Sequence, residues 1–303
     1  MLITEEQDGL LTIDAYAKLN FTLRVIKRYA DGYHELESLV QTIDLADTIE
    51  LRVAQSPNER SSGPLIEINN EFAVPQHNDL AYKVAQAVLA AKESDAAVKI
   101  NIKKRIPIGA GLGGGSSDGA AVLLGIDRLI GPRLTSDELL AIAAGLGSDL
   151  PLFLFGGLML IRGRGEKVTR LPPLFAQTIL LVVPPFSCDT TRVYQRYDEQ
   201  TAIKSSLFDR SPYATPGRGS HNDLETAALN LYPQLAPYRE TVAKLGSDLY
   251  GMSGSGATFY AVFSSCRQAK RAAEQVKDDL PRAMTFLCRP VVTGLKFTRG
   301  VLL

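Results

Sequence analysis

The residues best placed for chemistry form a glycine-rich stretch near the middle of the chain. Residues 107–119 read PIGAGLGGGSSDG, and five of the seven residues from Gly109 to Gly115 are glycine. Each glycine costs backbone entropy on folding, so a run of five needs a physical reason. Either the chain turns sharply here, or a ligand must come very close to the backbone.

A strand expected over 98–104 precedes this stretch, and a helix expected over 117–131 follows it. The backbone N–H groups of such a loop and the positive end of the helix together attract anions, phosphate above all. Two serine hydroxyls at the helix start would add donors. The candidate phosphate-binding residues are Pro107, Ile108, Gly109, Ala110, Gly111, Leu112, Gly113, Gly114, Gly115, Ser116 and Ser117.

Other phosphate loops fit this stretch less well. The lysine-bearing P-loop pattern fails, because no lysine follows any of the glycines. Gly109, Gly111 and Gly114 match G-x-G-x-x-G formally, but a dinucleotide fold needs a second strand after the helix. Here the helix over 117–131 leads to another helix. A plain turn explains one or two glycines, so a cradle of backbone amides is the favoured interpretation.

Lys18, Asn20 and Asp149 are further polar residues with two open interpretations. Lys18 and Asn20 fall on the polar face of TIDAYAKLNFTLRV (12–25), whose alternation predicts a half-buried strand. A single lysine in such a place usually lies on a solvated strand face. Asp149, in GLGSDLPLF, could simply cap a helix that has Pro151 in its first turn. Residue type alone leaves a catalytic role open for each.

Three shorter motifs remain. DGYH (31–34) contains an Asp-Gly turn signal, but a turn does not require the tyrosine and histidine that follow. MSGSG (252–256) predicts either a tight connection between two strands or a second glycine loop that lies beside the first and lines a cleft between the domains. GRGE (163–166) predicts a turn to which we assign no chemistry. No spacing of His, Cys and Asp indicates a structural metal site.

The elements that must position these residues mix strands and helices along the chain. The expected strands of the first half cover 12–25, 36–43, 48–54, 65–69 and 98–104, and the helices cover 77–92, 117–131 and 135–147. In the second half we expect strands at 178–185, 248–252, 257–263 and 284–293, and helices at 190–198, 223–247 and 266–279. A length of 303 residues suggests two domains.

Composition excludes several classes of protein. The formal net charge is zero, so no global basic field points to nucleic acid or an anionic membrane. Lys103, Lys104 and Arg105 still leave room for a local anion site. The three cysteines form no C-x-x-C pair, and the apolar run at 150–161 is too short to cross a bilayer. With no signal peptide at the N-terminus, we expect a cytoplasmic protein.

Taken together, the motifs resemble those of the GHMP kinase superfamily. P-x-G-A-G-L-G-G-G-S-S-D is similar to its central motif, and AKLNFTLRVIKRYADGYHEL (17–36) resembles the N-terminal signature of one branch. LGSDLPLF (146–153) resembles the catalytic aspartate segment, and MSGSGATFYAVF (252–263) the third motif. The motifs occur in the family's order over nearly the whole chain, and D-G-Y-H is the most specific of them.

This resemblance implies an α+β class and the two-domain GHMP kinase fold. In that fold an N-terminal ribosomal-protein-S5-like α/β domain and a C-terminal ferredoxin-like α+β domain enclose the active site in the cleft between them. We expect the first domain, with the ATP loop, over 1–168 and the second over 169–303.

The resemblance also implies roles for single residues. Asp149 would be the general base that accepts the proton of the substrate hydroxyl, and Lys18 its cationic partner. Asn20 would hydrogen-bond the same region. Tyr33 would stack on a cytosine whose polar edge His34 reads, and Tyr194 would lie opposite. ATP would bind the glycine loop together with Mg²⁺, and Ser117 and the ATP phosphates would do most of the ligation, since no carboxylate is identified as a ligand.

The implied activity is transfer of a phosphoryl group from ATP to the 2-hydroxyl of a cytidine diphosphate-linked methylerythritol, a step of the non-mevalonate route to isoprenoids. The alternatives are another GHMP small-molecule kinase, for homoserine, mevalonate or a sugar, and a nucleotide-binding module without activity. We expect a small-molecule substrate, no nucleic acid and no membrane as partners, with a homodimer as an option.

Overall fold

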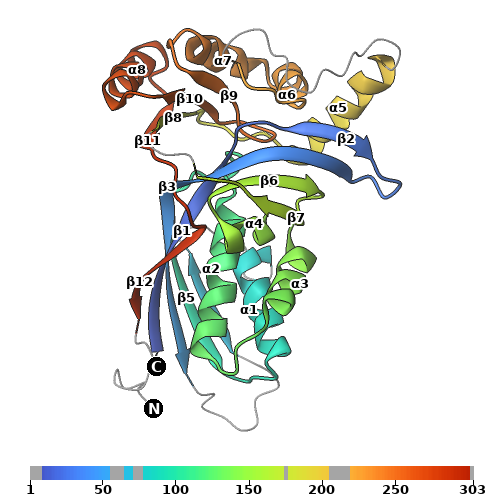
Figure 1. The fold of residues 1–303 in the computed structure, drawn as a ribbon, viewed down its shortest axis with the longest axis vertical. Helices are drawn as coiled ribbons and strands as arrows, with labels where there is room; N and C mark the ends of the chain where they lie inside the picture. Colours follow the sequence, from blue (N-terminus) through green and yellow to red (C-terminus); the bar gives the residue numbers. More distant parts are fainter. Residues whose placement is uncertain (1–8, 55–64, 71–77, 174–176, 205–218, 301–303) are drawn as a thin grey trace.

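The protein contains two β-sheets, one above the other, with helices packed on each (Figure 1). The structure is a computed structural model and describes residues 9–54, 65–70, 78–173, 177–204 and 219–300. Within this part of the chain one sheet has eight strands and the other has four. The architecture is α+β and agrees with the expected class.

The larger sheet forms the lower half of the molecule in Figure 1 and has the strand order β12-β1-β3-β5-β4, with β2, β6 and β7 attached through β3. β1 and β3 are its central pair. Its strands are β1 (Gly9–Asn20), β2 (Arg24–Arg28), β3 (His34–Ala54), β4 (Ile66–Asn70), β5 (Ala97–Lys103), β6 (Leu158–Gly163), β7 (Lys167–Arg170) and β12 (Leu295–Gly300). Its helices are α1 (Leu80–Ala91), α2 (Gly114–Leu129), α3 (Ser136–Leu146) and α4 (Leu150–Phe155).

The smaller sheet has the order β11-β8-β10-β9, and its strands are antiparallel. Its strands are β8 (Thr178–Val183), β9 (Leu249–Met252), β10 (Phe259–Phe263) and β11 (Met284–Cys288). The helices are α5 (Thr190–Lys204), α6 (Glu225–Leu231), α7 (Ala236–Ala243) and α8 (Cys266–Asp279), with a 3₁₀ turn at Pro233–Leu235. Most of them lie above the sheet, as Figure 1 shows.

The first expected strand, 12–25, is wrong in one respect, because the chain breaks it after Asn20. β2 resumes at Arg24, and the bend between them is held by the Leu23 N–H, which donates to the carbonyl of His221 at 2.9 Å. A residue nearly two hundred positions away therefore ends the strand. Local alternation cannot reveal such a partner.

The two strands expected at 36–43 and 48–54 are one strand, β3. The polar residues between them suggested a break, but tertiary contacts satisfy them inside the strand. Asp44 accepts the N–H of Arg289 at 2.7 Å, and the fully buried Asp47 accepts the N–H of Arg105 at 2.6 Å. A buried polar group that is fully hydrogen-bonded does not interrupt a sheet.

Two helices, α1 and α3, begin at side-chain caps that the sequence signals. The Asp79 side chain accepts the N–H of Ala81 and starts α1, and Thr135 forms a capping box with Glu138 at the start of α3. α4 is the short helix that Asp149 and Pro151 allowed, with Asp149 at its N-cap position and Pro151 in its first turn. α5 runs beyond the expected end at 198, and the polar segment 205–220 lies mostly outside the described residues.

The two sheets share a hydrophobic core. One buried cluster combines Leu19 and Ile43 of the larger sheet with Ile179 and Leu181 of the smaller one. β12 returns to the larger sheet and pairs antiparallel with β1, so the end of the chain completes the first sheet. The division at 168/169 stays a prediction, and β12 lies on the other side of it.

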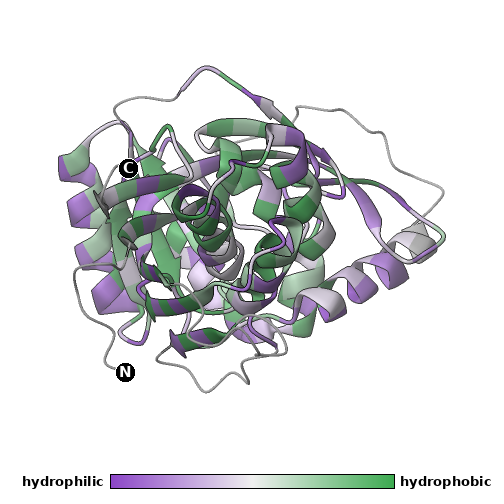
Figure 2. Cartoon of the chain, turned by 90° about the horizontal axis from the view of Figure 1, so that it is seen from below, coloured by the Kyte–Doolittle hydropathy of each residue, from purple (hydrophilic) through white to green (hydrophobic). Residues whose placement is uncertain are grey.

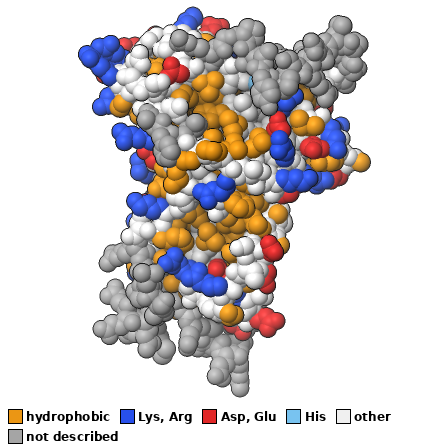
Figure 3. Space-filling view, in the orientation of Figure 1, with side chains coloured by type: hydrophobic (Ala, Val, Ile, Leu, Met, Phe, Trp, Pro, Cys, Tyr) orange, Lys and Arg blue, Asp and Glu red, His pale blue; other side chains and the backbone are white. Residues whose placement is uncertain are grey.

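Hydrophilic and hydrophobic residues are segregated across the fold. Figure 2 shows helices whose outer sides are hydrophilic and whose inner sides are hydrophobic. On the face seen in Figure 3, hydrophobic side chains gather along the middle and Lys and Arg follow the left margin. In the described part of the chain no helix is both long and apolar enough to cross a membrane. Cytoplasmic location and a homodimer stay predictions.

Candidate active site

The glycine loop is pressed against other backbone and side chains of the protein. Gly109, Gly111 and Gly113 have φ values of 66°, 76° and 72°, a backbone conformation that residues with a side chain rarely adopt. A Cβ on Gly111 would stand 2.7 Å from the carbonyl oxygen of Ser253, and one on Gly113 would stand 2.9 Å from Cγ of Lys18. The run of glycines therefore serves both sharp turning and close approach.

The loop lines a cavity of about 410 Å³ at the start of α2. Residues 107–116, which are ten of the eleven candidate phosphate-binding residues, line it. The helix begins at Gly114 without a side-chain cap, so its first N–H groups suit an anion. Ser117 does not reach the cavity, since it is completely buried and its Oγ has no partner among the described residues.

A second cavity of about 750 Å³ lies on the other side of the loop. Gly111, Gly113 and Ser116 line both cavities, so the loop forms a wall common to the two. All of the acceptor-side candidates line the second cavity: Lys18, Asn20, Tyr33, His34, Asp149 and Tyr194. Residues spread over more than half of the chain thus meet in one space.

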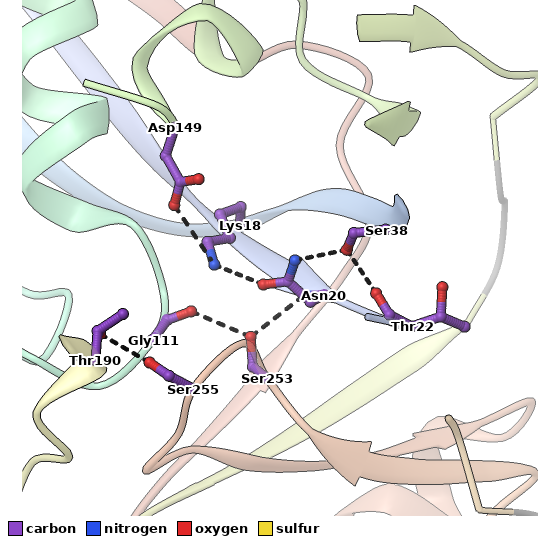
Figure 4. A network of polar contacts seen from close by, with 9 residues as sticks. All are labelled: Lys18, Asn20, Thr22, Ser38, Gly111, Asp149, Thr190, Ser253 and Ser255. Atoms are coloured by element: carbon purple, nitrogen blue, oxygen red, sulfur yellow. Dashed lines mark hydrogen bonds and ion pairs between the residues drawn. The ribbon is translucent and has the colours of Figure 1, made fainter. Parts of the chain in front are cut away.

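Lys18 and Asp149 face each other in this cavity (Figure 4). Lys18 Nζ lies 3.7 Å from Oδ2 of Asp149 and donates to Oδ1 of Asn20 at 2.6 Å. The lysine side chain is only 7% exposed, which rules out the solvated strand face, whereas that of Asp149 is 45% exposed. Asp149 occupies the cap position of α4 but makes no side-chain cap hydrogen bond, so its carboxylate is available to a ligand.

A relay of hydrogen bonds fixes Asn20. Its Nδ2 donates to Ser38 Oγ at 2.8 Å, and Ser38 in turn donates to the carbonyl of Thr22 at 2.5 Å (Figure 4). Because Oδ1 must then face Lys18, the amide has one orientation. The relay holds the lysine ammonium at a set place near Asp149.

The MSGSG segment lies beside the first glycine loop. Ser253 Oγ donates to the carbonyl of Gly111 at 3.1 Å and accepts the N–H of Asn20 at 3.2 Å (Figure 4). Ser255 shares a hydrogen bond of 2.8 Å with Thr190 at the start of α5. Ser253 thus joins β1, the glycine loop and the smaller sheet, a role that the sequence analysis did not assign to any single residue.

The far end of the second cavity is aromatic. His34 stacks on Tyr194 with ring centroids 4.8 Å apart, and its Nε2 lies 2.8 Å from Oδ1 of Asp198. Burial raises the pKa of the Tyr194 phenol, and the charge of Asp149 adds to the rise. Tyr33 is 57% exposed, and the guanidinium of Arg164 covers its ring at 4.8 Å.

Sequence reasoning missed Asp198, Arg28 and Arg164, which line this cavity as well. Asp198 had a usable signal, because it follows Tyr194 by four residues on a helix and therefore shares its face. Arg164 belongs to the GRGE turn, to which no chemistry was assigned. Nothing in its local sequence indicates the cavity.

Both lysines of the basic cluster at 103–105 are paired with carboxylates. Lys104 Nζ lies 2.5 Å from Asp47 and 2.6 Å from Asp118 behind the glycine loop. Burial raises the pKa of Asp118 to about 8, with Asp47 adding to the rise and Lys104 opposing it. Burial lowers the pKa of Lys104, but the two carboxylates outweigh it and the net pKa is raised. This charge cluster is structural.

The residues around the loop suit a magnesium ion held mainly by phosphates. Among the described residues no group of three His, Cys, Asp or Glu could hold a metal by itself. Mg²⁺ bound with a nucleotide needs only one or two protein ligands, because phosphates and water supply the rest. The Ser116 hydroxyl borders both cavities and can serve as such a ligand, while that of Ser117 is enclosed.

Two family models match the chain, one in its middle and one towards its C-terminal end. Residues 79–157 match the GHMP kinases N terminal domain, and residues 206–282 match the GHMP kinases C terminal domain. A curated relative from Carboxydothermus hydrogenoformans, 4-diphosphocytidyl-2-C-methyl-D-erythritol kinase, is 34% identical over 94% of this chain and 98% of its own. The protein of the same name from Geobacter sulfurreducens is 36% identical over 88% and 95%.

Solved structures agree with these matches. A crystal structure of 4-(cytidine 5'-diphospho)-2C-methyl-D-erythritol kinase superposes with a TM-score of 0.70 at 32% identity, over 91% of this chain and 98% of that one. Homoserine kinase from Cytophaga hutchinsonii reaches a TM-score of 0.69 at 16% identity, over 98% and 100%. The second likeness concerns the fold alone.

Proposed function

The chain belongs to the GHMP kinase family, and from this premise we propose that it transfers the γ-phosphoryl group of ATP to the 2-hydroxyl of 4-diphosphocytidyl-2-C-methyl-D-erythritol. It is a phosphotransferase with an alcohol as acceptor, and the reaction is a step of the non-mevalonate route to isoprenoid precursors.

One observation carries the proposal: the two cavities share the wall formed by Gly111, Gly113 and Ser116. ATP in the smaller cavity would lay its phosphates along this wall. Its γ-phosphate would then lie beside Lys18 and Asp149, next to an acceptor hydroxyl bound in the larger cavity. Positioning of this kind supplies much of the catalysis in phosphoryl transfer.

Lys18 and Asp149 divide the work at the acceptor hydroxyl. A lysine ammonium only donates hydrogen bonds, so the proton of the hydroxyl passes to a carboxylate oxygen of Asp149. Lys18, held by Asn20, orients the hydroxyl oxygen and stabilises negative charge on the transferred group. Because the transition state is loose, Asp149 has to orient the hydroxyl early and take its proton late.

Mg²⁺ would neutralise phosphate charge at the common wall, with Ser116 as its protein ligand. The backbone N–H groups at the start of α2 bind phosphate oxygens whether or not the metal is present.

The aromatic end would select the cytosine. Tyr33 offers an exposed ring for stacking, and His34 and Tyr194 form a stacked pair that borders the same cavity. A site that hydrogen-bonds a base edge rejects other bases strongly, because its own polar groups would otherwise stay unpaired. Homoserine and mevalonate have no such base.

A coupled ADP-release assay tests the proposal. The cytidine diphosphate-linked methylerythritol should be phosphorylated, whereas methylerythritol phosphate and homoserine should give little ADP. Faster turnover of homoserine would point to another GHMP kinase activity. ATP binding without ADP release from any acceptor would indicate a module without activity.

A further inference from the structure

The GRGE turn between β6 and β7 has a well-defined shape. The Glu166 carboxylate accepts the N–H of Arg164 at 2.6 Å. Gly163 and Gly165 have φ values of 73° and 123°, so the start and the middle of the turn use conformations that favour glycine. Arg164 and Gly165 line the larger cavity, and the backbone that carries them is held in place.

Among the described residues, the Arg164 side chain contacts three, all in the segment that carries Tyr33. Its guanidinium lies 4.8 Å from the ring centroid of Tyr33 and 5.0 Å from that of Tyr29. It also forms an ion pair with Asp31. A planar guanidinium can stack on aromatic rings and pair with a carboxylate at the same time, which an ammonium does less well.

The neighbouring residue touches the opposite end of the cavity. A Cβ on Gly165 would stand 2.4 Å from the carbonyl oxygen of Ser148, the residue before Asp149. Ser148 and Asp149 line the same cavity as Tyr33 and Arg164. One short turn therefore contacts both the segment that carries the base-stacking ring and the segment that carries the proton acceptor.

We propose that Arg164 is a positioning residue that holds the Tyr33 turn at a fixed place relative to the Ser148–Asp149 segment, and so tunes the enzyme for cytidine-linked acceptors. The role rests on the proposed function. Tyr33 is 57% exposed, so its ring has few contacts that order it without Arg164. Ordering the ring before the base arrives reduces the entropy lost on binding and raises affinity for the base.

Three variants test this role: Arg164→Ala, Arg164→Lys and the control Arg162→Ala. Arg162 lies two residues away and pairs with Glu37 at 2.9 Å, but it does not line the cavity. The measurements are KM for the cytidine substrate, KM for ATP, kcat, and the affinity for cytidine 5'-diphosphate by calorimetry.

Arg164→Ala should raise KM for the cytidine substrate about tenfold and weaken cytidine 5'-diphosphate binding by a similar factor. KM for ATP should stay within about twofold of wild type, since only the base end is disturbed. Arg164→Lys keeps the charge opposite Asp31 but loses the planar stack, so it should recover less than half of the lost affinity. Arg162→Ala should behave as wild type.

Several results would overturn the role. These are an Arg164→Ala enzyme equal to Arg162→Ala, a lowered KM, equal losses for ATP and the cytidine substrate, or full recovery in Arg164→Lys. If Arg164→Ala does not fold, Arg164→Lys decides the matter by the same ratio of KM values. A wild-type enzyme inactive on the cytidine substrate would overturn the proposed function together with this role, whereas an active wild type separates the two.

Discussion

The two cavities on either side of the glycine loop differ in the parts of the chain that line them. Glycine-rich backbone lines much of the smaller one, and two of its charged lining residues, Lys104 and Asp118, are paired with each other, Lys104 also with the buried Asp47. The larger cavity is lined by side chains from distant segments, and the Asp149 carboxylate is open to it. The Asp149 side chain is 45% exposed, while Asp47 is fully buried.

This difference in burial distinguishes charged residues that stabilise the fold from those that take part in the reaction. A charge that faces solvent or substrate is inexpensive to remove from the fold but costly to the reaction. A buried, paired charge has the opposite balance, because its removal leaves partners uncompensated. Removing a charged residue should therefore lower turnover at the larger cavity and lower stability behind the smaller one.

The largest expected effect is on turnover, at the larger cavity. Asp149→Asn should lower kcat about 1,000-fold, because the amide cannot take the proton of the acceptor hydroxyl. Its melting temperature and its affinity for ATP should stay near those of wild type, since Asp149 caps nothing. ADP release, calorimetry and thermal melting measure these. Asp137→Asn, exposed on α3, is the control, and a comparable kcat in both variants would contradict the assignment.

In the glycine loop itself, we expect steric clashes to determine how a substitution changes stability. Gly111→Ala should destabilise the fold by about 3 kcal/mol, because its methyl group meets the carbonyl oxygens of Ser253 and Gly256 and its φ is positive. Gly115→Ala is the matched change. Gly115 lies in α2 and no atom stands within 4 Å of the added methyl group. Because alanine favours a helix more than glycine does, this substitution should raise stability slightly. Chemical denaturation compares them, and equal stabilities would refute the close packing of the loop.

Behind the smaller cavity, charge removal should affect stability. Lys104→Met should destabilise by about 3 kcal/mol, since it leaves two buried carboxylates without their cation. Lys103→Met provides the control, because the neighbouring side chain is 64% exposed and pairs with Glu50 at the surface. Melting temperatures should differ by several degrees between the two variants. A melting temperature unchanged in Lys104→Met would mean that the cluster is not structural.

At the aromatic end of the larger cavity we expect a selective loss of affinity. Asp198→Ala removes the partner of His34 Nε2 and of Arg28, and should raise KM for the cytidine substrate about tenfold. KM for ATP should not change. Glu199→Ala, which alters the adjacent exposed residue, should have no effect on either value. Equal rises in both KM values would show that Asp198 supports the fold in general rather than the base site.

The last prediction concerns pH. The pKa of Asp118 in the folded protein, about 8, lies above its ordinary value of 3.8, so the folded state binds the proton more tightly than the unfolded one. Asp118 therefore favours folding at low pH, and this stability is lost as pH rises from about 4 to 8. Asp118→Asn should flatten the fall, with melting temperatures compared at pH 5.5 and about 8.5. Parallel curves for the two proteins would contradict the raised pKa.

The positions of most helices were predictable from the sequence because their causes are local, although α2 begins three residues before the expected start and α5 ends six residues after the expected end. The helix expected at 266–279 is α8, and Asp79 and Thr135 cap the helices that follow them. Periodicity and capping depend on neighbours within a few residues. The break after Asn20 and the continuity of β3 were missed because His221 and Arg289 cause them.

The sequence by itself determined the family, the phosphate loop and the residue types needed at each end of the acceptor site. Only the tertiary structure decided that the loop is a wall common to two cavities, that Ser117 is enclosed while Ser116 is not, and that Arg164 reaches the Tyr33 turn. The physical reason is the distance along the sequence between the residues that interact. Motifs record chemistry in adjacent residues, whereas burial, pairing and close approach arise between segments that only folding brings together.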